Sequence, residues 1–259
     1  MPSKPTSTDK LEDRIDITPQ DVKRFIDTHD DLYKGRLKIE LNYPRVVLLA
    51  WLKAYLDRTT NAFDWVGVVS GSEQDPELPL LQRQRLTVLN FDGSPTYDLD
   101  TDWTVSGVAA KHQFNFTLCS QVLEHVADAR QAFANLVACT APGGLILVSI
   151  PVVNRIHGEP YFYSSGFHPR YLLRLGREQG LEVKGYGQFG TAKYMMTCMA
   201  GKWLSYQQLA PGIHTSRDIV FPLFMFNDGR KENSRLERLL GFKQVMTDCW
   251  AVFRKSPVM

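Results

Sequence analysis

Titratable side chains gather at two places in the sequence. Glu124 and His125 stand side by side after the apolar segment 114–119. A second group follows the apolar segment 145–150 and consists of His157, Glu159, Tyr161, Tyr163 and His168. An imidazole has an unperturbed pKa of ~6.5, so a histidine at such a place suits a general base near neutral pH. We expect His125 to accept a proton from a bound molecule, with Tyr163 or His168 helping to position that molecule. The alternatives are that His125 caps or orients the next helix and that His168 begins one.

Smaller polar residues follow two other apolar segments. Ser70-Gly71-Ser72 comes after residues 65–69, and Asp92 comes after residues 86–91. A carboxylate that follows the second strand of a nucleotide-binding sheet can accept hydrogen bonds from both hydroxyls of a ribose. Asp92-Gly93 is equally a common turn pair. No second carboxylate lies close to Glu124 in the sequence, so we predict no metal site.

The elements that must position these residues alternate between strands and helices. Strands are predicted at 65–69, 86–91, 114–119, 145–150, 182–189 and 245–253, and helices at 128–139 and 169–179. The segment 145–150 is apolar throughout, as in a parallel sheet that is buried on both faces. Thr18-Pro19 and Asn42 begin two earlier helices, which run to about His29 and Arg58. The pattern predicts an α/β domain, in which ligands bind beyond the carboxyl ends of the strands.

Three sequence blocks resemble the small-molecule branch of the class I S-adenosylmethionine-dependent methyltransferases. They are Leu-Glu-His-Val at 123–126, Pro-Gly-Gly before the strand at 145–150, and Gly-Leu-Glu-Val at 180–183. The resemblance covers roughly residues 63–183 and the last strand. It implies a Rossmann-like, mostly parallel sheet of seven strands with helices on both faces. It also implies that S-adenosylmethionine is the cofactor and that a methyl group moves to an oxygen or nitrogen of a small molecule.

The resemblance also implies which residues meet the cofactor. Ser70, Gly71 and Ser72 take the place of the glycine-rich loop, and Asp92 would bind the ribose. Gln121 and Val122 begin the block at the methionine end of the cofactor. Asp102 and Trp103 would meet the adenine, as a hydrogen-bond acceptor and a flat apolar face.

The glycine loop departs from the family pattern. The family shows an acid and then Gly-x-Gly after its first strand, whereas here Val68 stands at the acid position and one glycine remains. Serine resists the positive φ that glycine allows. The alternative function is therefore a non-catalytic module that keeps the fold and has lost tight cofactor binding.

Composition limits the classes of partner. The 30 basic and 28 acidic residues give a net charge of +2, which is too even to indicate nucleic acid or an anionic membrane. The four cysteines lack metal-ligand spacing, and no segment is long and apolar enough to be a signal or an anchor. We therefore expect a cytoplasmic enzyme with reduced thiols and a small-molecule acceptor. The sequence does not identify that acceptor, the oligomeric state or the pathway.

The chain divides into five segments on this interpretation. We expect a mobile tail at 1–17, two helices within 18–60, a methyltransferase-like core at 61–189, and the last strand within 242–259. Residues 190–241 are rich in aromatic residues, methionine and proline. They are expected to form a lid over the acceptor or a small subdomain.

Overall fold

The computed structural model describes residues 15, 17–93, 95–190, 192–208 and 246–257. Its sheet has six strands in the order β2-β1-β3-β4-β6-β5. The strands are β1 (Ala62–Val69), β2 (Gln82–Leu89), β3 (Phe114–Ser120), β4 (Thr140–Pro151), β5 (Glu182–Phe189) and β6 (Asp248–Arg254). β1 to β4 pair in parallel, and β6 lies antiparallel between β4 and β5. The Rossmann-like α/β fold is confirmed, whereas a seventh strand is not found within the described part of the chain.

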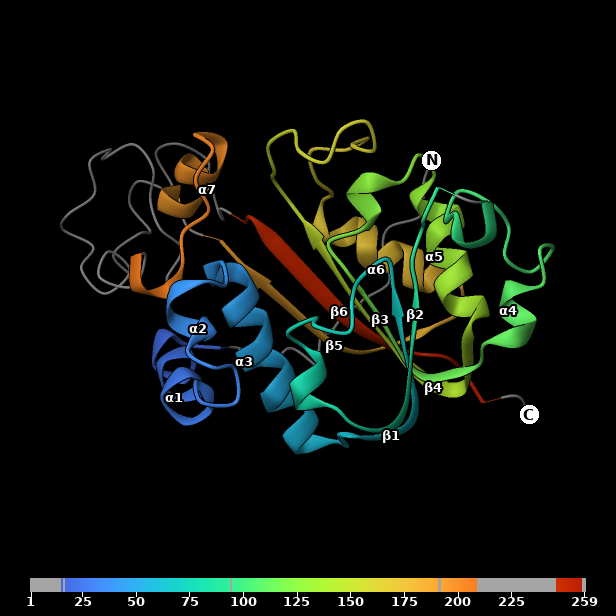
Figure 1. Cartoon of the computed structure of the whole chain (residues 1–259), viewed down its shortest axis with the longest axis horizontal. Helices are drawn as coiled ribbons and strands as arrows, with labels where there is room; N and C mark the ends of the chain where they lie inside the picture. Colours follow the sequence, from blue (N-terminus) through green and yellow to red (C-terminus); the bar gives the residue numbers. More distant parts are fainter. Residues whose placement is uncertain (1–14, 16, 94, 191, 209–245, 258–259) are drawn as a thin grey trace, which may run out of the picture.

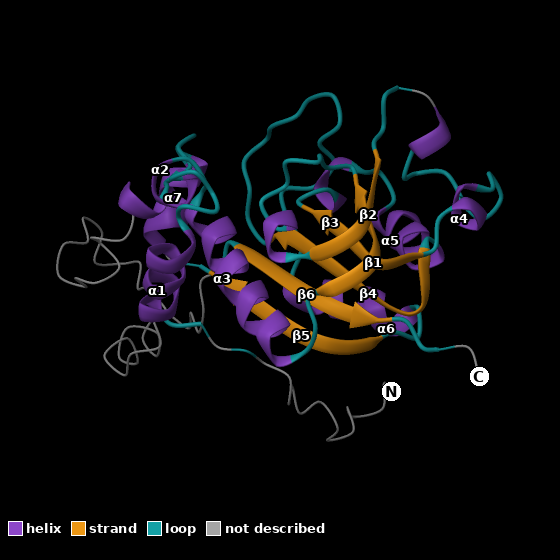
Figure 2. Ribbon diagram, turned by 60° about the horizontal axis from the view of Figure 1, so that its bottom comes forward, coloured by secondary structure: helices purple, strands orange, loops and turns teal. Residues whose placement is uncertain are grey.

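Two helical layers cover the sheet (Figures 1 and 2). The helices are α1 (Pro19–His29), α2 (Arg36–Ile39), α3 (Tyr43–Arg58), α4 (Val108–Lys111), α5 (Ala129–Ala138), α6 (Pro169–Glu178) and α7 (Ala192–Met199). α1, α3 and one face of the sheet share one apolar core, and α5, α6 and the opposite face share a second. None of the helices described is long and apolar enough to cross a membrane.

The two expected N-terminal helices are present, and their first residues are set by the sequence. Thr18 caps α1: its side chain accepts from the backbone N–H of Asp21, and the Asp21 carboxylate bonds back to Thr18. The Asn42 side chain caps α3 by accepting from the N–H of Arg45. Most of α3 is buried, because one side faces the sheet and another faces α1.

Between β1 and β2 the chain forms only a short 3₁₀ turn, η1 (Leu78–Leu80). An ordinary crossover between parallel strands carries an α-helix whose N-terminus lies at the ligand edge of the sheet. That N-terminus is missing here after β1. α3, which precedes β1 in the chain, lies on the face that such a helix would cover.

The expected lid is only partly within the described residues, since 191 and 209–241 fall outside. α7 and residues 200–208 pack near the start of α3, where the Tyr43 N–H donates to the Leu204 carbonyl at 2.8 Å. Tyr194 and Cys198 join the core on the α3 side. A lid over a site is thus not confirmed. Of the expected tail at 1–17, only residues 15 and 17 are described.

Candidate functional site

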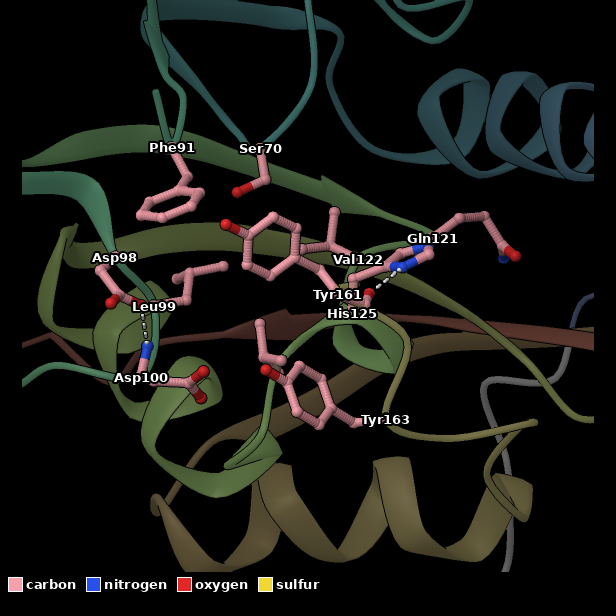
Figure 3. A pocket seen from close by; sticks show the side chains of 11 residues that line it. Ser70, Phe91, Asp98, Leu99, Asp100, Gln121, Val122, His125, Tyr161 and Tyr163 are labelled. Atoms are coloured by element: carbon pink, nitrogen blue, oxygen red, sulfur yellow. Dashed lines mark hydrogen bonds between the residues drawn. The ribbon is translucent and has the colours of Figure 1, made fainter. Parts of the chain in front are cut away.

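A cavity of about 350 Å³ opens at the carboxyl ends of β1, β2 and β3 (Figure 3). Its wall combines polar and aromatic side chains, with the ring of Tyr161 in the middle of the group. The lining residues are Ser70, Phe91, Asp98, Leu99, Asp100, Gln121, Val122, His125, Val126, Tyr161 and Tyr163. The size lies in the range of small-molecule sites, and the position is where the sheet topology predicts a ligand.

Left-handed backbone conformations place two of these residues in the wall. Ser70 has φ 52° after β1, and Gln121 has φ 59° after β3. Such values cost a non-glycine residue ~1–2 kcal/mol. Backbone hydrogen bonds hold both, from Ser70 N–H to the Leu89 carbonyl at 2.8 Å and from Gln121 N–H to the Ser149 carbonyl at 2.9 Å. Ser70 thus adopts the conformation for which glycine is usual.

The rest of the predicted cofactor loop, Gly71 and Ser72, does not line the cavity. The Asp75 carboxylate accepts from the Ser72 N–H and hydroxyl, both at 3.2 Å. Gly71 lies so close to Asp75 that an added Cβ would come within 2.3 Å of Oδ2. Gly71 and Ser72 are not among the lining residues, so only Ser70 of the three faces the cavity.

The residues predicted to meet ribose and adenine lie near the cavity but not in its wall. Asp92 is exposed after β2, and its neighbour Phe91 lines the cavity instead. Trp103 is fully buried, and its indole N–H donates to the Asp98 carbonyl at 2.8 Å. Asp102 is exposed and binds Thr104 at 2.6 Å, which lowers the pKa of the Asp102 carboxyl.

Residues 98–100 face the cavity in place of Asp102 and Trp103, which lie four positions later in the chain. Leu99 supplies apolar surface, and Asp98 and Asp100 supply carboxylates. The Asp100 carboxylate accepts from the N–H groups of Ala127 and Asp128 at 3.0 and 2.7 Å. It therefore ties this segment to the start of α5. The sequence pointed to Asp102 and Trp103 in this segment, whereas Asp98, Leu99 and Asp100 face the cavity.

The three residues predicted to act on the acceptor have different surroundings. His125 and Tyr163 line the cavity. His168 is exposed and caps α6, where its Nδ1 accepts from the Arg170 N–H at 3.2 Å. The structure therefore places His168 as the helix start that the sequence offered as its alternative role. Tyr161, which the sequence grouped with these residues without a role, is in the wall.

His125 is held in one tautomer. Its Nδ1 lies 2.6 Å from the Tyr161 carbonyl oxygen, which can only accept, so Nδ1 carries the proton and Nε2 keeps its lone pair. Partial burial lowers the pKa of His125, with a further contribution from His157 nearby. Nε2 lies 3.9 Å from Oε1 of Glu124.

Glu124 is buried and has no hydrogen-bond partner for either carboxylate oxygen within the described structure. Burial raises the pKa of Glu124 to about 8. The sequence pointed to Glu124 but gave no sign of this environment, because burial of a side chain after a strand depends on the loops that cover it. The loop 152–168 lies against this segment, since the Tyr163 N–H donates to the Glu124 carbonyl at 2.9 Å.

A buried ion pair lies beneath the same edge and was not predicted. Arg45 of α3 binds Glu77 at 2.7 Å, and the Glu77 side chain has no exposed surface. Glu77 also accepts from the Ser120 hydroxyl at 3.3 Å. The pair ties α3 and the η1 turn to the end of β3. Its partners are 32 residues apart in the chain, so no local pattern could indicate them.

Comparison with family models identifies a known type of domain in part of the chain. The family model described as a methyltransferase domain matches residues 70–185. No curated protein matches significantly.

Solved structures with a similar fold include a putative sarcosine dimethylglycine methyltransferase from Galdieria sulphuraria. It is 14% identical, with a TM-score of 0.43 and coverage of 91% of this chain and 98% of that one. The N-methyltransferase NodS from Bradyrhizobium japonicum WM9, in complex with S-adenosyl-L-homocysteine, is 15% identical, with a TM-score of 0.41 and coverage of 93% and 99%. The (4+2)-cyclase SpnF is 14% identical, with a TM-score of 0.46 and coverage of 94% and 98%.

The family match spans both left-handed residues, the whole cavity wall and the Leu-Glu-His-Val block. Residues 70–185 therefore match a methyltransferase domain, which confirms the resemblance that the sequence motifs indicated.

Proposed function

We propose that this protein transfers a methyl group from S-adenosylmethionine to an oxygen or nitrogen of a small molecule. The observation that carries the proposal is the cavity at the carboxyl ends of β1 to β3, which lies inside the matched methyltransferase domain. A cavity of about 350 Å³ suits a small ligand better than a polymer. The near-zero net charge also favours a small molecule over nucleic acid.

The lining residues fit such a cofactor. Phe91 and Leu99 offer apolar surface for a purine, and Phe91 packs edge-on against Tyr161 at 5.7 Å between ring centroids. The Asp98 carboxylate and the Ser70 hydroxyl supply hydrogen-bonding groups for a ribose. The Gln121 amide extends away from the other lining side chains (Figure 3) and donates to the Ser149 hydroxyl at 3.4 Å. When bound, the cofactor supplies a methyl group that is already activated on a sulfonium.

The protein's own part is to align the acceptor, exclude water and remove a proton. His125 lines the cavity, and its Nε2 is the ring nitrogen able to accept a proton. Because that atom also lies 3.9 Å from Glu124, we assign proton acceptance to the Glu124–His125 pair. Tyr163, in the same wall, is the residue we assign to positioning the acceptor.

Calorimetric titration with S-adenosyl-L-homocysteine tests the cofactor assignment. We expect the wild-type chain to bind it and Phe91→Ala to bind about tenfold more weakly, because an aromatic contact of ~1.5 kcal/mol is lost. Ile39→Ala is the matched control, since Ile39 is also an exposed apolar residue but lies on α2, outside the cavity wall.

The alternative is a binding module without catalysis. The hydrogen bonds within the predicted cofactor loop at residues 70–72 favour it. The Asp75 carboxylate already accepts from the Ser72 N–H, and the described residues between β1 and β2 contain no α-helix. A folded wild-type protein that binds neither S-adenosyl-L-homocysteine nor S-adenosylmethionine would support this module and contradict the enzyme. If the cofactor binds, formation of S-adenosyl-L-homocysteine with a panel of phenols and amines identifies the acceptor class.

A further inference from the structure

The Glu124 carboxylate lacks a partner in a place where a carboxylate needs one. Its side chain is completely inaccessible to solvent, and neither oxygen has a hydrogen bond in the part of the chain described. A buried polar group without a partner costs free energy, and native proteins rarely leave one so. The nearest basic atom is Nε2 of His125, at 3.9 Å from Oε1, which is beyond hydrogen-bond distance.

A second histidine, His157, completes a group of three. One ligand atom from each of Glu124, His125 and His157 lies within 4.8 Å of the others. The two imidazole rings lie nearly perpendicular, with their centroids 4.7 Å apart. His157 comes from the loop after β4, far from the Glu124-His125 pair in the sequence. Chain spacing around Glu124 therefore gave no sign of the group, and the sequence predicted no metal.

Both histidines are oriented by their second nitrogen. His125 Nδ1 lies 2.6 Å from the Tyr161 carbonyl oxygen, and His157 Nδ1 lies 2.9 Å from the Arg155 carbonyl oxygen. A carbonyl only accepts, so each Nδ1 carries the hydrogen and each Nε2 keeps a lone pair. Metal-binding histidines usually show this arrangement, because the bond to the carbonyl fixes the ring and makes the free nitrogen more basic.

We propose that Glu124, His125 and His157 bind a divalent transition-metal ion of the Zn²⁺ class. Two imidazole nitrogens and one carboxylate form the ligand set of a metal site that keeps a position open for a further ligand. Ligand atoms around one Zn²⁺ stand roughly 3.5 Å apart, since each is ~2.0–2.2 Å from the ion. The ligand atoms, which lie within 4.8 Å of one another, must therefore approach each other by up to roughly 1.3 Å.

The site adjoins the cavity, because His125 belongs to both. An ion there would take the lone pair of Nε2, so the proton acceptance assigned to the Glu124–His125 pair belongs to the metal-free protein. The ion would then lower the pKa of a bound hydroxyl and so do the work of a base. The metal proposal does not depend on methyl transfer, and its test uses neither cofactor nor acceptor.

The test is calorimetric titration of the full chain with Zn²⁺ after dialysis against EDTA. We expect one Zn²⁺ per wild-type chain. Glu124→Gln and His157→Gln should each weaken binding by about 100-fold or more, since loss of even an outer partner costs 10–100-fold. His29→Gln on α1 is the matched control and should bind as wild type does. Urea unfolding verifies that each variant is folded.

Several outcomes would overturn the proposal. They are the absence of Zn²⁺ binding to folded wild type, equal affinity in wild type and both variants, and binding through cysteine. The absorption spectrum of the Co²⁺-loaded protein detects binding through cysteine, because thiolate ligands add an intense charge-transfer band that nitrogen and oxygen ligands lack. If Glu124→Gln fails to fold, His157→Gln decides, because His157 is partly exposed and its replacement leaves the core intact.

Discussion

Glu124 makes stability depend on pH in a direction opposite to that of most carboxylates. Burial raises its pKa from 4.5 to about 8, so between these values the folded state holds a proton that the unfolded state has released. Stability is therefore full below about pH 4.5 and falls as the pH rises toward 8.

Glu124→Gln removes this dependence. In metal-free protein, wild type should lose stability between pH 5 and pH 8.5, whereas the variant lacks this loss. The difference in free energy of unfolding, variant minus wild type, should therefore increase over this range. Asp248, whose pKa burial also raises, is present in both proteins. Its charge also raises the pKa of Glu124, so the difference reports Glu124 together with this interaction. Urea denaturation at the two pH values provides the measurement. A difference that does not change with pH would contradict the buried, partnerless environment described for Glu124.

Ser70 offers a second prediction for a single residue. Its φ of 52° costs serine ~1–2 kcal/mol, and glycine avoids that cost but loses ~0.5–1 kcal/mol of chain entropy. Ser70→Gly should therefore leave stability unchanged or raise it by up to ~1 kcal/mol. Ser106→Gly, in an exposed turn without positive φ, should lower it by ~0.5–1 kcal/mol. Equal losses in urea denaturation would show that Ser70 is not strained.

At the scale of elements, the Arg45–Glu77 pair fixes α3 against the η1 turn. Arg45→Met leaves a fully buried Glu77 without its cation, so we expect a loss of ~3–5 kcal/mol in the free energy of unfolding. Arg36→Met is the matched control, because Arg36 pairs with Glu40 on the surface and the loss should be below ~1 kcal/mol. Similar losses in urea denaturation for both variants would mean that Arg45 contributes no more than a surface charge.

The elements themselves could largely be predicted from the sequence. Caps such as Thr18 and Asn42 depend on neighbours in the chain, so they indicated the starts of α1 and α3 closely. The apolar run 145–150 indicated only the second half of β4, which begins at Thr140 and includes the Pro-Gly-Gly that was expected to precede the strand. The short crossover after β1 was not predicted, because it is evident only once β2 is known to begin at Gln82.

The site was harder to predict, because its members come from four separate loops. Ser70, Gln121, Val122, His125 and Tyr163 were predicted as site residues and line the cavity. Trp103 was predicted to meet the adenine, whereas it is fully buried in the core that α5, α6 and one face of the sheet share. An indole suits a ligand-binding wall and an apolar core equally well, so residue type alone does not decide between the two. Only the packing of the folded chain does. His157 lies near Glu124 because of the path of the loop after β4, and the distance between the two residues in the sequence does not indicate this.

At the scale of the whole molecule, the sheet separates two cores that should respond independently. Ile26 lies in the core beneath α1 and α3, and Ile146 lies in the core beneath α5 and α6; both are fully buried. Ile26→Val and Ile146→Val should each cost ~0.5–1.5 kcal/mol, and the double variant should equal their sum within ~0.5 kcal/mol. A departure from the sum would mean that the two cores are energetically coupled. A second transition in urea unfolding would mean that they unfold separately.

The position of β6 between β4 and β5 also bears on how this protein is made. β5 pairs only with β6 among the described strands, yet residues 190–247 are synthesised between them. While those residues emerge from the ribosome, β4 and β5 both present unpaired N–H and C=O groups to any other chain. A nascent chain that stalls before Asp248 therefore carries two open sheet edges, which makes it a target for chaperones and a source of aggregates.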